Sequence, residues 1–168
     1  METENTNTIN PEIEVEAENA LMPITDNMPV TSNNFDEVFG GNIIAEAYSG
    51  DMSTEAGRAA YYKCITDCDA RVSEMINRVI MVRDIYSAKV NARNTETGEI
   101  KVLTRVVLID TDGCAYTCSS AGVVNSLNAI FRMFGEPTWE NGLPLMVKQK
   151  TLKNGNSILT LVYCPNGK

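Results

Sequence analysis

The sequence contains no histidine. Histidine is the most frequent general base near neutral pH and the most frequent metal ligand, so its absence weakens the case for acid–base or metal-dependent catalysis. The glycine motifs of phosphate-binding loops and dinucleotide-binding folds are missing too. We therefore expect no cofactor and no metal, and we predict that the protein is not an enzyme.

Long hydrophobic runs are also missing. No stretch approaches the roughly 20 apolar residues that span a bilayer. The first residues show neither the basic start nor the apolar run of a secretory signal. These features predict a protein without a membrane partner, whose five cysteines are free thiols in a reducing compartment.

Two cysteine pairs have a four-residue spacing that raises the question of a zinc site. Cys64 and Cys68 would share one face of a helix. Cys114 and Cys118 on a strand would lie ~13 Å apart at ~3.3 Å per residue, which is too far for one ion. Buried structural thiols are the favoured interpretation, and zinc is the weaker alternative.

Positive charge is missing from the first third of the chain. Residues 1–57 hold 12 Asp and Glu and no Lys or Arg, a net charge of −12, whereas residues 58–168 hold 10 acids and 14 bases, a net charge of +4. Such an asymmetry suggests a polyanion-binding domain or an interaction tail. A solvated tail on an ordinary domain explains it equally well.

Composition divides the chain into three predicted regions. Residues 1–48 form an acidic, largely disordered arm, because this composition cannot bury enough apolar area to offset the ordering entropy. A short apolar motif at 35–39 is either a docking motif or a tether on its own domain. Residues 49–77 form a helical extension, with apolar residues at helical spacing over 53–76. Residues 78–168 form the folded domain.

Alternating, β-branched stretches in this domain predict five strands, at 79–93, 101–109, 114–118, 145–152 and 158–163. A helix between Ser120 and Gly135 separates the third strand from the fourth. This order is that of the OB-fold, a five-stranded, partly open barrel. The predicted fold class is mainly β: a five-stranded OB-like barrel with one helix between strands three and four, preceded by a helix and the disordered acidic arm.

Basic residues alternate with apolar ones along the predicted strands. We expect six of them to gather on one face of the barrel, as Lys89, Arg93, Lys101, Arg105, Lys148 and Lys150. A cationic groove of this kind tracks the phosphates of a single strand. A solvated sheet face is the alternative, because Lys and Arg are common at the edges of antiparallel sheets.

Aromatic side chains near these cations are candidates for stacking on bases, namely Tyr86, Tyr116 and Trp139. Strict alternation places Tyr86 with the apolar residues of its strand. A β-bulge at Asp84 would rotate Tyr86 outward, toward bound nucleic acid.

Several segments carry a resemblance to a known family. They are the first strand with Tyr86, the stretch 104–116 with its Asp-Gly turn, a helix entry with Val123 and Val124, and the stretch 145–150 before a Lys/Gly/Asn turn. Together they resemble the single-stranded DNA-binding proteins of small tailed bacteriophages, including those with protein-primed replication.

The resemblance implies an OB barrel in the cytoplasm of the bacterial host. It implies binding to single-stranded DNA without strong sequence preference, which protects displaced strands during replication. The positions that match the aromatic and basic binding residues of the family are Tyr86, Lys89, Tyr116, Lys148 and Lys150.

The acidic N-terminal arm departs from this family pattern, because many replication proteins of this type carry an acidic tail at the other end. We expect the arm either to contact replication proteins or to compete with DNA for the basic groove of its own domain, to which its negative charge is attracted. The alternative function is a phage interaction or inhibitor protein whose acidic arm mimics nucleic acid toward a host protein. The sequence gives no oligomeric state.

Overall fold

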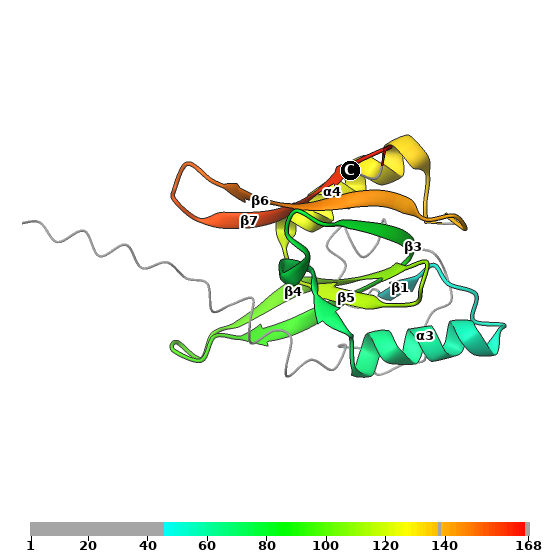
Figure 1. The fold of residues 1–168 in the computed structure, drawn as a ribbon. Coiled ribbons are helices and arrows are strands. Elements are labelled where there is room, and N and C mark those ends of the chain that lie inside the picture. The colour runs from blue at the N-terminus through cyan, green and yellow to red at the C-terminus, as the bar shows by residue number, and fades with distance from the viewer. Residues whose placement is uncertain (1–45, 138, 167–168) are drawn as a thin grey trace, which may run out of the picture.

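The computed structural model describes residues 46–137 and 139–166. Seven strands form one sheet that curls into a half-barrel, with a helix on either side (Figure 1). The elements in chain order are β1 (Glu46–Tyr48), α3 (Glu55–Thr66), β2 (Ala70–Arg71), the 3₁₀ helix η1 (Val72–Met75), β3 (Val79–Arg93), β4 (Ile100–Asp110), β5 (Ala115–Cys118), α4 (Ala121–Phe134), β6 (Leu143–Thr151) and β7 (Ser157–Tyr163).

The long strand β3 organises the sheet, whose strand order is β2-β5-β4-β3-β6-β7, with β1 paired to β3. Its first residues, 79–82, pair with β6, and its later residues pair with β4 on one edge and with β1 on the other. The β3–β4 register shifts between Val82 and Asp84, which is a β-bulge. A bulge bends a strand, and here it lets one strand belong to both halves of the curled sheet.

The mainly-β prediction is confirmed, and α4 lies between the third and fourth of the five predicted strands. The strand count is corrected from five to seven, because β1 and β2 add to the sheet. Among the described strands no ladder joins β5 to β7, so the sheet stays open as a half-barrel.

The helix predicted over 53–76 is also corrected, because α3 ends at Thr66. The physical reason is a set of polar contacts just beyond the helix. The Asp69 carboxylate pairs with Lys63 and accepts a hydrogen bond of 2.7 Å from the backbone N–H of Ala115. These contacts draw the chain into β2, which pairs with β5.

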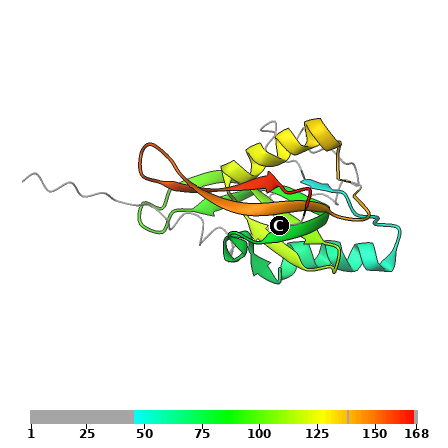
Figure 2. The same ribbon diagram turned by 45° about the horizontal axis from the view of Figure 1, so that its top comes forward.

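Two apolar clusters lie on opposite sides of the β3–β4 pair. On one side, which we call the α4 side, Ile85, Val106 and Leu108 pack with α4, β6 and β7. On the other, the α3 side, Tyr86 and Val107 pack beneath α3. Figure 2 shows α3 and α4 separated by the strands between them. Alternation along the strands produces this two-layer arrangement.

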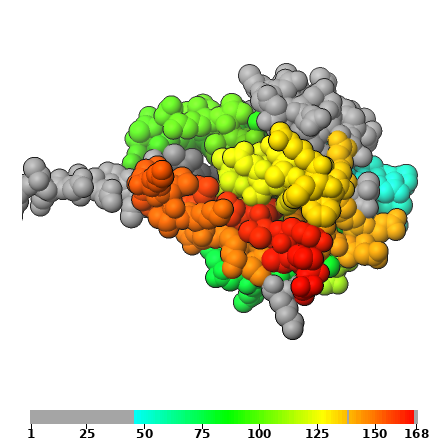
Figure 3. Space-filling view, turned by 90° about the horizontal axis from the view of Figure 1, so that it is seen from above, coloured from blue at the N-terminus to red at the C-terminus, as the bar shows by residue number. Residues whose placement is uncertain are grey.

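Helix α4 covers the edge of β7. The Ser120 hydroxyl donates to the Leu159 carbonyl oxygen over 3.1 Å, and the Leu161 N–H donates to the Ser126 hydroxyl over 3.0 Å. Figure 3 shows α4 lying against β7 on the surface seen from above. Two backbone groups of this edge strand, the Leu159 carbonyl and the Leu161 N–H, are therefore satisfied by side chains of a helix.

Residues 1–45, which contain most of the predicted acidic arm and the motif at 35–39, lie outside the described residues. Within the described ranges, neither helix has the length and apolar content needed to cross a membrane.

Candidate nucleic-acid interface

Two hairpins extend from the half-barrel in the same direction (Figures 1 and 2). We call residues 88–105 the β3–β4 hairpin and residues 148–160 the β6–β7 hairpin. They correspond to the two places where the sequence concentrates basic residues.

The charge of both hairpins favours a polyanionic ligand. The β6–β7 hairpin contains Lys148, Lys150 and Lys153 and no Asp or Glu. The β3–β4 hairpin contains four basic residues and two acids, a net charge of +2. Clustered cations raise the local concentration of a polyanion and release its counterions on binding.

The expectation that six cations share one face is corrected by the β3–β4 register. Lys89 pairs with Thr104, and Arg105 pairs with Ala88. Directly paired residues lie on the same face of a sheet, so Lys89 and Arg105 lie on opposite faces. Alternation along each strand then places Arg93 with Lys89, and Lys101 with Arg105.

Three cross-strand pairs on the α4 side form what we call the hairpin strip: Lys89↔Thr104, Asn91↔Val102 and Arg93↔Ile100. The Lys89 ammonium donates to the Thr104 hydroxyl over 2.7 Å. Partial burial lowers the pKa of Lys89. The sequence does not single out the other four residues of the strip as site residues, because they carry no charge and their exposure depends on where the core ends. They are Asn91, Thr104, Val102 and Ile100.

In β6, Lys148 and Lys150 lie on the face opposite the buried Val147, as the alternation predicts. The Lys148 ammonium donates to the side-chain oxygen of Asn77 over 3.0 Å, which fixes its position. Lys150 is exposed near the end of the strand, and Lys153 is exposed in the turn. The basic character therefore continues to the tip of the hairpin.

Arg105 lies inside the protein, with 7% of its surface exposed. Its Nε donates to the Thr117 hydroxyl over 3.2 Å, and its Nη2 donates to the Cys68 sulfur over 3.4 Å. It lines a polar cavity of about 370 Å³ next to β2. Arg105 thus ties β4 to β5 and to the chain after α3. Lys101 lies on the same side of β4 but is exposed, and its ammonium nitrogen forms an ion pair with the Glu99 carboxylate over 3.7 Å.

Tyr86 is fully buried, with 0% of its surface exposed. A bulge is present next to Asp84, but it turns Tyr86 onto the α3 side and not outward. There the Tyr86 ring packs edge-on against the Tyr61 ring at a centroid distance of 5.8 Å. Burial raises the pKa of Tyr86, and the charge of Glu46 raises it further. In this fold the ring has no surface to offer a nucleobase.

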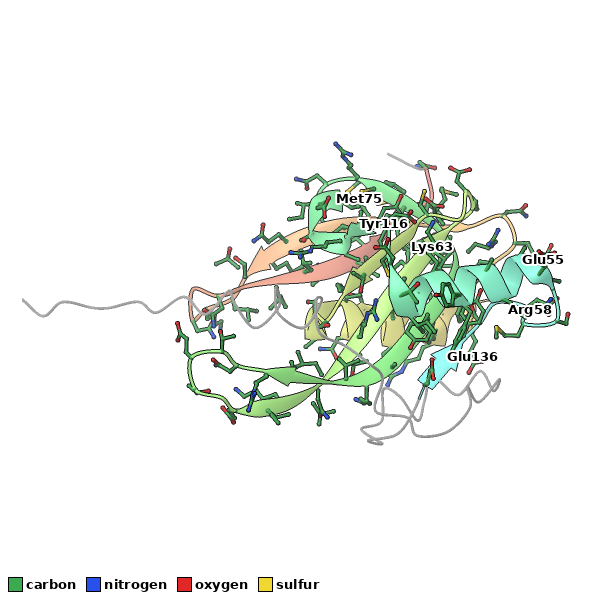
Figure 4. All side chains as sticks on the ribbon, turned by 90° about the horizontal axis from the view of Figure 1, so that it is seen from below. Glu55, Arg58, Lys63, Met75, Tyr116 and Glu136 are labelled. Carbon is green, nitrogen blue, oxygen red and sulfur yellow. The ribbon has the colours of Figure 1, made fainter. Side chains whose placement is uncertain are left out.

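Tyr116 and Trp139 also pack on the sheet. The Tyr116 hydroxyl donates to the Asp110 carboxylate over 3.0 Å, and Tyr116 and Met75 pack against the same apolar cluster (Figure 4). The ring centroids of Trp139 and Phe131 are 6.1 Å apart. Trp139 also lines a cavity of about 390 Å³, together with residues of the connection between β1 and α3. The two hairpins themselves contain no aromatic residue.

The described residues include no group of three or more Cys, Asp or Glu that could hold a metal ion. A curled β-sheet with basic hairpins has the features of a nucleic-acid-binding module. Residues 45–163 match the family model described as the Phi29-type phage single-stranded DNA-binding protein, and the chain belongs to this family. It is a nucleic-acid-binding, non-enzymatic family. No curated protein and no solved structure matches the chain.

Proposed function

We propose that this protein coats single-stranded DNA without strong sequence preference, through its two basic hairpins, and protects displaced strands during phage replication in the bacterial cytoplasm. The observation that carries the proposal is the charge of the hairpins in a member of a single-stranded DNA-binding family. Lys150, Lys153 and Arg93 are exposed and belong to no ion pair within the described part of the chain.

Low sequence preference follows from the chemistry of these side chains. Lys and Arg contact phosphates, which are identical at every nucleotide. Lys89 is held in place, because its ammonium donates a hydrogen bond to the Thr104 hydroxyl. A constrained cation loses less side-chain entropy when it binds a phosphate.

The acidic N-terminal segment supplies the second half of the proposal, contact with replication proteins. Residues 1–45 carry nine Asp and Glu and no Lys or Arg. A segment of this charge is repelled by DNA phosphates and attracted to basic surfaces. When DNA covers the basic hairpins of the same chain, a basic surface on a partner protein remains for this segment to bind.

An electrophoretic shift titration at low salt tests DNA binding, with single- and double-stranded oligonucleotides of two unrelated sequences. Two double variants remove charge from the hairpins: Lys89→Gln with Arg93→Gln, and Lys150→Gln with Lys153→Gln. Arg132→Gln in α4 is the matched control, because Arg132 is exposed but lies outside both hairpins. We expect tight binding of both single strands, and a loss of about tenfold for each double variant but none for the control.

Absence of binding to any single strand at low salt would overturn the proposal and favour the interaction or inhibitor function. Equal losses in the control and in the hairpin variants would mean that net charge, and no particular surface, determines affinity.

A further inference from the structure

Two aliphatic side chains are exposed on the hairpin strip. Ile100 has 61% of its surface exposed and Val102 has 47%. Both lie on one face of the two-stranded part of the hairpin, two residues apart on β4, and Ile100 is the first residue of that strand. Alternation would place polar side chains on this face if it met only water. Adjacent exposed aliphatic residues, bordered by polar ones, are typical of a contact surface.

The cross-strand register places a polar partner beside each of them. Arg93 lies opposite Ile100, and Asn91 lies opposite Val102. Directly paired Cβ atoms are about 4.5–5.5 Å apart. The strip therefore has two parallel rows, one basic and polar along β3 and one mostly aliphatic along β4.

A single DNA strand has the same two-row character. Its phosphates form a charged row and its unpaired bases form an apolar row with polar edges. We propose that Ile100 and Val102 form a shelf that contacts the bases of the bound strand, while Lys89 and Arg93 hold its phosphates. This inference rests on the proposed function and adds the surface that receives the bases.

The charge of the strip favours DNA over a peptide as the occupant. Both basic residues of the strip are on the row beside the shelf, and no acid lies among its six residues. Since neither hairpin contains a ring, contact with the bases here depends on aliphatic side chains. Aliphatic contact does not select among bases by hydrogen bonding, which agrees with low sequence preference.

The test replaces the shelf without disturbing the strand. Ile100→Thr and Val102→Thr together keep both residues β-branched, which preserves strand propensity. Val162→Thr is the matched control, an exposed valine on β7 with 41% of its surface exposed. The probes are an oligo-dT and an abasic oligonucleotide of equal length, titrated with full-length protein whose thermal unfolding matches wild type.

We expect the double variant to bind oligo-dT about tenfold more weakly than wild type. Its affinity for the abasic strand and its salt dependence should be unchanged, because the phosphate contacts remain. The proposed shelf would be overturned if the double variant bound oligo-dT with wild-type affinity. It would also be overturned if the double variant lost affinity equally for oligo-dT and for the abasic strand. These outcomes differ from failure of the proposed function, in which wild type binds neither probe.

A peptide-binding role for the strip would give another result. The double variant would then bind both oligonucleotides as wild type does, while losing an interaction with a protein partner. That outcome also overturns the shelf.

Discussion

Gly122 in α4 lies directly against the carbonyl oxygen of Leu159 in β7. A Cβ atom at position 122 would lie 2.2 Å from that oxygen, far inside contact distance. The close approach is what allows Ser120 and Ser126 to hydrogen-bond the backbone of β7. Because Gly122 has no side chain, α4 can pack directly against the backbone of the edge strand β7.

Gly122→Ala should therefore destabilise the protein, although alanine is the better helix former. The helix must move away from β7, which weakens both serine contacts and costs about 1–3 kcal/mol. Chemical denaturation with a circular dichroism readout measures the loss. Asn125→Ala, at an exposed position of the same helix, is the control and should be neutral or stabilising. Unchanged stability in Gly122→Ala would show that the helix can shift at no cost.

Tyr86→Ala should unfold or strongly destabilise the protein, by about 3–5 kcal/mol, because it removes a fully buried ring. Tyr86→Phe keeps the ring and should fold. Its affinity for single-stranded DNA, measured per folded molecule, should equal that of wild type. A folded Tyr86→Phe with greatly weakened DNA binding would contradict the core placement, since the buried hydroxyl could then not be inert.

The salt dependence of binding should identify the phosphate contacts. Each neutralised phosphate of a single strand contributes about −0.7 to the slope of log affinity against log salt. If about three or four cations make such contacts, the wild-type slope is about −2 to −3. Lys150→Gln with Lys153→Gln should make the slope shallower by about 1.4. An unchanged slope would place the DNA away from the β6–β7 hairpin.

The stability of the protein should fall in acid partly through Asp69. Burial by itself raises the pKa of Asp69, but Lys63 and the Ala115 N–H outweigh burial and lower it. A carboxyl whose pKa is lowered by folding stabilises the protein above its unfolded pKa of about 3.9 and loses this effect as the pH falls through the folded value.

Asp69→Asn should therefore lower the melting temperature at pH 7, by about 2–4 °C at most, because the ion pair is partly exposed. The difference from wild type should shrink below about pH 4. Asp67→Asn, two residues away and exposed, is the control. A difference that persists unchanged at pH 3 would mean that the substitution acts through packing and not through charge.

The sequence predicts the strands of the half-barrel well, because alternation and Asp-Gly or Asn-Gly turns are local signals. β3 occupies the predicted residues, and β6 and β7 begin within two residues of the predicted positions. The end of α3 could not be predicted in the same way. It depends on the contacts of Asp69 with Lys63 and Ala115, and Ala115 is distant in the sequence.

In the candidate site, alternation along a strand predicts the relative placement of basic residues within one strand but not between two strands. Alternation within each strand correctly places Lys89 with Arg93 on β3, and Lys101 with Arg105 on β4. It does not say whether the β3 pair and the β4 pair lie on the same face of the sheet or on opposite faces. That choice is made by the register of the β3–β4 hairpin, in which Lys89 meets Thr104. From the sequence, a bulge at Asp84 is only the condition that would turn Tyr86 outward. The direction in which the bulge turns this ring depends on α3, whose packing over Tyr86 is a long-range contact.

Trp139 is the single tryptophan of the chain. It packs beside Phe131, and no hairpin residue lines its cavity. Its fluorescence is therefore an optical reporter of how α4 and the following loop sit on the sheet. Unfolding of this protein can therefore be followed by the emission of one tryptophan in one environment. No added label is needed, and no second indole contributes to the signal.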